Sequence, residues 1–188
     1  MKRILLIAAM AMATVAGFAQ PKFAHVNASE LIELTPEADQ AYATIVASQK
    51  EAQDTFQAML DEREAKYKVY EEKSATWNQA TREVKEKEIV DMEKRIQEFQ
   101  QNVSAELQQQ QQALFEPIAK KVNDTIQEIA KAGGYIFVFD KLSNGLVYID
   151  ETQSVDITAA CRKALGISDD RTIETVNAER QALYQNAQ

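Results

Sequence analysis

The sequence predicts a mostly helical α+β fold, in which a long coiled-coil hairpin is inserted into a small β-body that self-associates. Three observations lead to this prediction. Between Glu37 and Ala132 the chain has no glycine and a single proline, while alanine, glutamine, glutamate and lysine are abundant. Apolar residues within this stretch recur at the spacing of a coiled coil. Segments rich in aromatic and β-branched residues flank it on both sides.

The first 19 residues have the pattern of a cleavable signal peptide. Lys2 and Arg3 form a basic start, and an apolar run extends from Ile4 to Val15. Small residues precede a predicted cut between Ala19 and Gln20, so we expect an exported chain without a stable membrane anchor. The alternative is a membrane-spanning helix, but the apolar run is shorter than the roughly 20 residues that a span requires.

The charge of the mature chain excludes two classes of partner. Removing Lys2 and Arg3 from the 21 basic residues leaves 19 against 29 acidic ones, a net charge of −10. A chain of this charge is not expected to bind nucleic acid. Nor is it expected to dock electrostatically on an anionic membrane.

The residues that usually carry catalysis or bind metals are nearly absent. The chain has one cysteine, Cys161, and one histidine, His25, which is too few for an internal disulfide or a typical zinc site. We interpret His25 as a packed strand residue and Cys161 as a small buried one. No glycine-rich phosphate loop or nucleophile motif is present, so the sequence predicts neither an enzyme nor a cofactor.

The body begins with a short strand at residues 22–26. Asn27 and Glu30 form a capping box for a helix over residues 28–34. A second helix is predicted to start at Thr35-Pro36, with a capping hydroxyl followed by proline at the first helical position.

The arm follows over residues 37–131. Two apolar runs carry the coiled-coil pattern, the second at alternating spacings of three and four, although Arg63 occupies a position in the first. Their members are Phe56, Arg63, Tyr70, Trp77 and Val84, then Ile89, Met92, Ile96, Phe99 and Val103. We place the hairpin tip near residues 74–81, where polar and β-branched residues separate the runs. Pro117 should kink the returning helix near residue 113, because it removes one backbone hydrogen bond.

The rest of the body follows a glycine stop at Gly133-Gly134. Residues 135–140 and 146–150 read as two strands of a β-hairpin whose turn, 141–145, contains Asn144-Gly145. The continuous apolar composition of the first strand suggests that it is covered on both faces. Asp156 then caps a closing helix over residues 157–165, which Gly166 ends. Residues 169–188 form a polar tail that we expect to be a loosely attached helix or disordered.

The expected organisation is therefore a signal peptide (1–19), a body (20–36 and 132–168), an arm (37–131) and a tail (169–188). A body this small, without disulfide or metal, is marginally stable alone and leaves strand edges exposed, so we expect it to self-associate. The residues that we assign to the association are Phe23, Val26, Ile136, Phe137, Val138, Phe139, Val147, Tyr148 and Ile149.

These pieces, in this order, resemble the Skp/OmpH family of periplasmic chaperones over residues 20–166. The resemblance rests on the signal peptide, the strand KFAHVN and the long helical hairpin. It continues through LFEPIAKKVNDTIQEIAKAGGYIFVFD, LVYID and the DIT that opens the closing helix. It implies a jellyfish-shaped homotrimer that encloses unfolded outer-membrane β-barrel proteins in the periplasm without ATP. The acidic arm differs from the basic arm of the best-known member, which puts charge attraction to such clients in doubt.

Six arm residues are candidates for contact with such unfolded clients, because flexible or amphipathic apolar side chains suit weak binding to many sequences. They are Met59, Tyr67, Tyr70, Trp77, Met92 and Phe99. The alternative is that these side chains only fill the contact between the two arm helices. A second function is also open, that of a structural coiled-coil spacer or bridging protein of the cell envelope. It predicts a well-paired arm, whereas a chaperone arm should be imperfectly paired.

Overall fold

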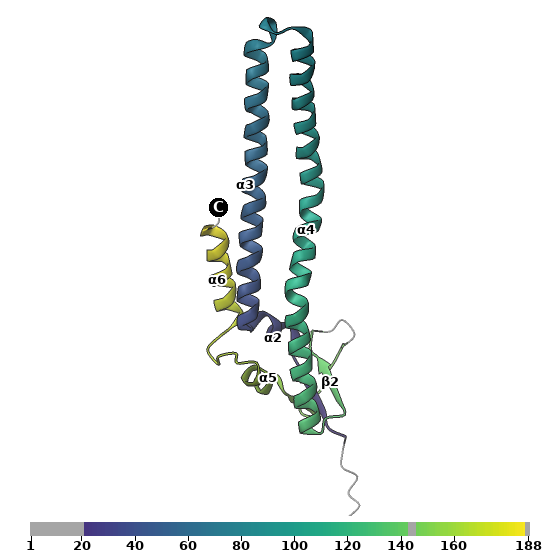
Figure 1. Cartoon of the computed structure of the whole chain (residues 1–188). Coiled ribbons are helices and arrows are strands. Elements are labelled where there is room, and N and C mark those ends of the chain that lie inside the picture. The colour runs from purple at the N-terminus through teal and green to yellow at the C-terminus, as the bar shows by residue number, and fades with distance from the viewer. Residues whose placement is uncertain (1–20, 143–145, 187–188) are drawn as a thin grey trace, which may run out of the picture.

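The computed structural model describes residues 21–142 and 146–186, and the predicted signal peptide lies outside this range. Two long helices, α3 (Pro36–Lys73) and α4 (Gln79–Gly133), lie side by side and form the arm (Figure 1). A small body of strands and short helices sits at the end of the arm that is opposite the tip. The mostly helical α+β class and the long helical hairpin are thereby confirmed. Trimerisation stays a prediction.

The arm helices begin and end at local signals. Thr35 Oγ1 accepts a hydrogen bond from the Ala38 amide at 3.2 Å, and Pro36 occupies the first turn of α3. At the tip, a short 3₁₀ turn, η1 (Ser74–Thr76), leads to Asn78, whose Oδ1 accepts from the Thr81 amide at 2.9 Å. Helix α4 runs unbroken through Pro117 and ends at Gly134, which adopts the left-handed conformation with φ 68°.

The body contains a three-stranded parallel sheet. Its strands are β1 (Phe23–Val26), β2 (Phe137–Asp140) and β3 (Ser154–Asp156), in the order β2-β1-β3. The register pairs Phe23 with Phe137 and with Ser154. The central strand is therefore the N-terminal one, and the arm forms the long crossover between β1 and β2.

The predicted β-hairpin between residues 135–140 and 146–150 is wrong. Strand β2 pairs in parallel with β1, and residues 146–150 form no strand. Val147 and Tyr148 are instead 99% and 79% exposed. The third strand is β3, a short segment without apolar alternation. Strand composition is a local signal, whereas the partner of a strand depends on where the chain returns, so the composition misled the prediction. The turn residues 143–145 lie outside the described range.

The core lies between the sheet, the lower part of α4 and three short segments. These are α2 (Ala28–Leu34), α5 (Thr158–Ala164) and the chain that follows α5. Ala24 and Val26 point from β1 into this core, and the predicted burial of Cys161 is confirmed. The full cluster is Ala24, Val26, Leu31, Leu34, Val122, Ile126, Ile157, Cys161, Leu165, Ile167 and Val176. Gly166, with φ 72°, ends the α5 segment as the sequence predicts.

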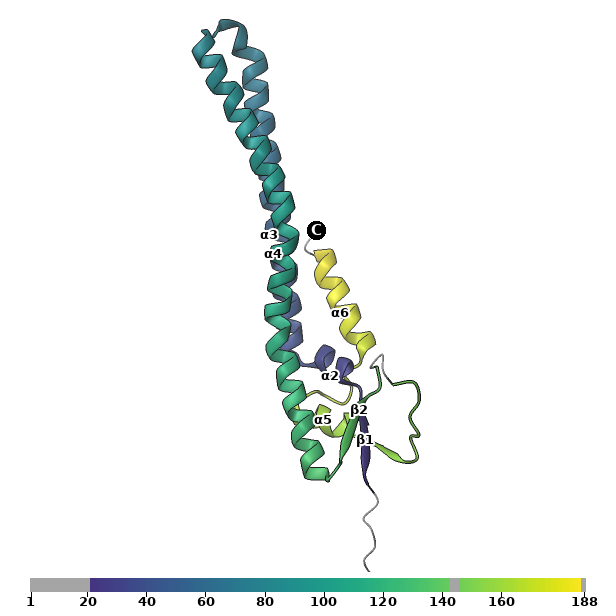
Figure 2. The ribbon, with the colours of Figure 1, turned by 90° about the vertical axis from the view of Figure 1, so that its right-hand side faces the viewer.

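The tail forms a helix that packs onto the rest of the chain, so disorder was the wrong alternative for it. Helix α6 (Ile173–Asn186) runs beside α3, pointing toward the arm tip (Figures 1 and 2). Val176 and Arg180 are buried against α2 and α3. The polar composition of the tail did not indicate this packing, because one of the two buried residues of α6 is an arginine.

Candidate functional site

The two ends of the arm differ in how well their helices pack. We call residues 36–46 and 118–133 the arm base, and residues 47–73 with 79–117 the distal arm. Seven side chains of the arm base are buried: Ala38, Ala41, Ile45, Val46, Ile118, Val122 and Ile126. The much longer distal arm buries three, Ile89, Met92 and Ile96. The arm base is therefore a continuation of the core, whereas the distal arm is a thinly packed helix pair.

The middle of the distal arm contains an open groove between the helices. No side chain of α4 from 97 to 117 is buried. Ala52 of α3 faces Val103 and Leu107 of α4, and these residues line hollows on both sides of the helix contact. Phe56 and Phe99 stack across it, with ring centroids 6.3 Å apart and planes at 12°. The side chains therefore do not fill the space between the two helices, and the groove exposes apolar surface.

Polar groups hold the two helices together on either side of this groove. Gln110 donates to Ser48 Oγ at 2.9 Å on the side nearer the body. Lys66 Nζ lies 3.6 Å from Glu88 Oε2 on the side nearer the tip. Such exposed polar contacts contribute little net stability. In the distal arm, these polar contacts therefore add little to the burial of Ile89, Met92 and Ile96.

The tip carries an aromatic pair. Tyr70 and Trp77 pack edge to face, with centroids 6.0 Å apart and planes at 63°. The Tyr70 hydroxyl donates to the Glu86 carboxylate, and this hydrogen bond raises the pKa of Tyr70. Both rings remain only half-buried, because only two helices meet there.

The six predicted contact residues thus have different environments. Met92 is 2% exposed and belongs to the helix contact, whereas Tyr67 is 53% exposed. The other four, Met59, Tyr70, Trp77 and Phe99, are half-buried along the distal arm. The structure brings Phe99 into the groove and joins Tyr70 to Trp77 at the tip.

A second apolar surface lies on the outer face of the sheet. Phe23, Phe137 and Phe139 stack there, with centroid distances of 6.1–6.3 Å. Phe137 is 59% exposed and Phe139 37% exposed, so within one chain β2 is an edge strand with one open face. The expectation that this strand is covered on both faces is therefore not met by the chain alone.

The nine residues assigned to self-association have different environments. Val26 is buried in the core, and Val138 packs against it. Phe23 and Ile149 are half-buried. The remaining five are exposed: Ile136, Phe137, Phe139, Val147 and Tyr148.

His25 is a packed residue, as its sequence position suggested. It is 2% exposed, and its Nδ1 lies 2.9 Å from Ser154 Oγ. Its Nε2 lies 3.5 Å from Asp156 Oδ2. Asp156 also accepts from the Thr158 amide at 2.8 Å at the start of α5. This arrangement ties β1 to β3 and is a structural contact.

Cys161 is equally enclosed, and burial raises the pKa of its thiol to about 11, so it is a poor nucleophile. Within residues 21–142 and 146–186, no group of three or more His, Cys, Asp or Glu side chains could hold a metal ion. In the same range, no helix has the length and apolar character needed to cross a membrane.

Two features escaped the sequence reasoning. The groove depends on Ala52, a small residue whose effect is visible only once its partners across the arm are known. Arg180, which is buried against α2 and α3, could have been suspected from the spacing of Ile173, Val176 and Arg180 along one helix face.

Comparison with known protein families gives a match over most of the chain. The family described as Outer membrane protein (OmpH-like) matches residues 22–165, which include both arm helices, the sheet and α5. Helix α6 lies beyond the matched residues. Among curated proteins, none matches this chain.

Proposed function

The chain belongs to the OmpH-like family, and from this membership and its thinly packed arm we propose that it is an ATP-independent periplasmic holdase. Proteins of the family are periplasmic, non-enzymatic chaperones, and this chain is not an enzyme. Its clients would be unfolded outer-membrane β-barrel proteins, enclosed between the arms of a homotrimer. The observation that carries the proposal is the groove of the distal arm, with Phe56, Phe99 and Leu107 in an unfilled helix contact.

Enclosure would act by separating clients from one another. Unfolded β-barrel proteins expose strand edges and apolar segments that pair between chains and aggregate. A client held inside one assembly cannot meet another client. Many weak apolar contacts in the groove of the distal arm would retain the client. The client would be released when folding into the membrane becomes available.

The open sheet face supports assembly of several copies. The Phe23, Phe137 and Phe139 rings form an apolar surface beside β2, which is an edge strand of the sheet that the structure describes. Such an edge is an aggregation hazard unless another chain covers it. We propose that other copies of this chain cover it in a homotrimer, with the arms projecting from the shared body.

The first experiment measures light scattering after a urea-unfolded outer-membrane β-barrel protein is diluted into buffer with the mature chain, Gln20 onward. Suppressed aggregation at about one assembly per client, without ATP, is the expected result. The groove variant, Phe99→Gln with Leu107→Gln, should be needed at several-fold higher concentration than the unaltered chain to suppress aggregation equally. The matched control, Val84→Gln with Val90→Gln, changes exposed apolar residues of α4 outside the groove and should behave as the unaltered chain.

Unchanged aggregation at excess protein would reject the holdase. The structural spacer of the cell envelope would then be the better proposal, because it requires a specific partner and no binding of unfolded chains. If the groove variant and the control suppress aggregation equally, the holdase proposal stands, but the groove is not the surface that binds clients.

Sedimentation equilibrium tests the assembly. The unaltered chain should sediment as three copies, and Phe137→Glu with Phe139→Glu should sediment as one. Leu183→Glu, which adds a charge at an exposed position of α6, is the control and should leave the assembly intact. A monomeric unaltered chain at micromolar concentration would contradict the trimer.

A further inference from the structure

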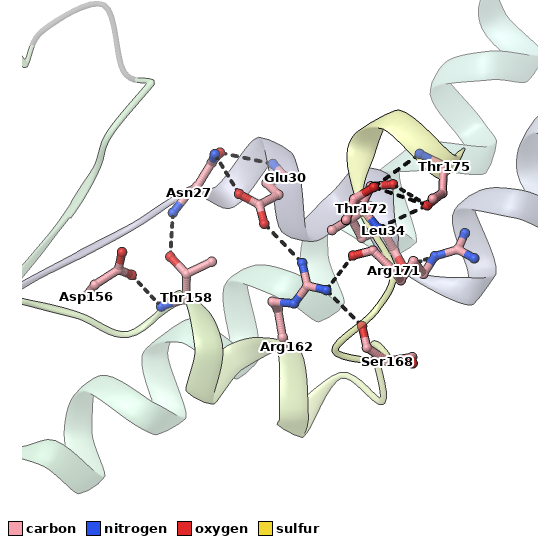
Figure 3. Close-up of polar contacts among 10 residues, drawn as sticks. All are labelled: Asn27, Glu30, Leu34, Asp156, Thr158, Arg162, Ser168, Arg171, Thr172 and Thr175. Carbon is pink, nitrogen blue, oxygen red and sulfur yellow. Dashed lines mark hydrogen bonds and ion pairs between the residues drawn. The ribbon is translucent and has the colours of Figure 1, made fainter. Parts of the chain in front are cut away.

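Three arginines from the C-terminal part of the chain converge on the junction between α2 and α3. Arg162 lies on α5, Arg171 lies just before α6, and Arg180 lies within α6. Their carboxylate partners are Glu30, Glu33 and Asp39, which lie on α2 or in the first turn of α3. Figure 3 shows Arg162 and Arg171 with the groups around them.

Arg162 fixes the segment that leads to α6. Its Nη1 donates to Glu30 Oε1 at 3.1 Å. Its Nη2 donates to the main-chain oxygens of Ser168 at 2.8 Å and Arg171 at 2.6 Å (Figure 3). The connection between α5 and α6 is therefore folded around one guanidinium group that is itself anchored to α2.

Arg171 contacts both sides of the junction. Its Nε donates to the main-chain oxygen of Leu34, the last residue of α2, at 2.9 Å. Its Nη2 donates to both carboxylate oxygens of Asp39, in α3. The Leu34 carbonyl is one of the groups that a helix end leaves without a partner, so Arg171 also caps α2.

Arg180 spans the same junction from farther along α6. It donates to the Glu33 carboxylate and, at 2.6 Å, to the Glu33 main-chain oxygen in α2. Its guanidinium carbon lies 3.7 Å from the ring centroid of Tyr42 in α3, a cation–π contact. Tyr42 in turn packs edge to face on Phe115 of α4, with centroids 5.2 Å apart. Arg180 is 7% exposed, so this contact is largely shielded from water and salt.

The junction that these two arginines span is a single residue, Thr35, between α2 and α3. Arg171 and Arg180 each bind a main-chain oxygen before Thr35 and a side chain after it. A contact that only fastened α6 would not need to touch both helices. Asp39, Tyr42 and Val46 follow one another at spacings of three and four, so they form one stripe along α3 that faces α6.

We propose that Arg171 and Arg180 are positioning residues that fix the angle at which the arm leaves the body, with α6 acting as a brace across the α2–α3 junction. The brace lies beyond the residues that match the family, so it is an addition to the arm-and-body plan. The inference concerns arm geometry and does not depend on what the arm binds.

The test measures the distance distribution between spin labels at Val69→Cys on α3 and Ala159→Cys on α5, with Cys161→Ala to remove the native thiol. Labelled chains are diluted in unlabelled ones, so that only distances within a chain are observed. Arg171→Gln with Arg180→Gln should widen the distribution about twofold or more. The matched control, Arg82→Gln with Arg95→Gln, removes two arginines of the distal arm and should leave the width unchanged.

Rescue separates positioning from a general loss of stability. Arg180→Lys keeps the charge but loses the planar fork, and it should widen the distribution partly. The charge exchange Glu33→Arg with Arg180→Glu should narrow it again relative to Arg180→Glu alone, whatever happens to the melting temperature. The proposal is overturned if the double glutamine variant keeps the unaltered width while hydrogen exchange shows that α6 has detached. It is also overturned if the charge exchange fails to narrow the distribution in a folded protein.

Discussion

The arm base and the distal arm are made of the same two helices, yet they have different interiors. In the arm base, Ala38, Ala41 and Ile118 form a buried cluster, and Val122 and Ile126 belong to the body core. In the distal arm, Ala52 faces Val103 and Leu107 across a groove that the side chains do not fill. The boundary between the two regions falls at Pro117.

The difference shows that helix formation and helix packing are separate properties of this chain. Both regions have strong helix formers and no glycine before Gly133, the last residue of α4, so both are helical. The arm base also belongs to a core that includes residues of α2, α5 and α6, which supply additional surface for burial. We expect the distal arm to open locally at a much lower free energy than the arm base, which is what the proposed holdase would require.

The largest effect should come from matched truncations in the two regions. Ile118→Ala, in the arm base, removes buried atoms and should lower the free energy of unfolding by about 2–4 kcal/mol. Leu107→Ala removes as many carbon atoms from the half-buried groove and should cost about 1 kcal/mol or less. Denaturant unfolding of both variants measures the two values. Equal losses would mean that the two regions are packed alike.

Replacing Pro117 tests whether this proline shapes the boundary between the arm base and the distal arm. Pro117→Ala restores a backbone donor in the middle of α4 and should stabilise the chain by about 1–3 kcal/mol. If the proline kinks the helix, as the sequence predicts, small-angle X-ray scattering of the variant should show a straighter and longer arm. Glu116→Ala, one residue earlier and exposed, is the control and should change neither quantity. A destabilised variant would show that the arm depends on the bend.

The helix caps at the two ends of the arm provide a smaller test. Thr35→Ala removes a buried hydroxyl that caps α3 and donates to the Ile32 oxygen at 2.9 Å. It should cost about 1–2 kcal/mol of global stability. Asn78→Ala removes the exposed cap of α4 and should cost about 0.5–1 kcal/mol, mainly as fraying of the tip. Hydrogen exchange should therefore accelerate throughout the arm base in the first variant and only near residues 79–82 in the second.

The smallest effect should be the loss of stability in acid. Each region has one carboxylate whose pKa is lowered by a hydrogen bond from a lysine. A hydrogen bond from Lys121 lowers the pKa of Glu37 in the arm base. A hydrogen bond from Lys85 likewise lowers the pKa of Glu88 in the distal arm. Because the folded pKa is below the ordinary value of 4.5, each pair stabilises the fold above that pH. The contribution is lost as the pH falls below 4.5 and through the folded pKa.

Both pairs are exposed, so each loss should be slight. Glu37→Gln and Glu88→Gln should each flatten the dependence of melting temperature on pH below 4.5, by similar amounts. A markedly larger change for Glu37→Gln would show that the arm base shields its ion pair, and would extend the contrast between the regions to electrostatics.

The sequence by itself determined the elements whose hydrogen bonds are local. Thr35-Pro36 and Gly134 mark the beginning of α3 and the end of α4, and Gly166 ends the α5 segment, because capping and left-handed glycines act within a few residues. The coiled-coil spacing likewise predicted that Ile89, Met92 and Ile96 are buried in the arm, but it was wrong for Val84, which is 56% exposed. The family resemblance predicted from these pieces agrees with the match over residues 22–165.

Only the tertiary structure decided the contacts between distant segments. Residues 146–150 have the composition of a strand, yet β3 at residues 154–156 takes the place beside β1. Arg180 belongs to a polar tail, yet it is buried because Glu33 and Tyr42 lie where α6 returns. Likewise, Ala52 lines a groove only because Val103 and Leu107 lie opposite it across the arm. In each case the outcome depends on a partner far away in the chain, and a local pattern of residue types does not specify that partner.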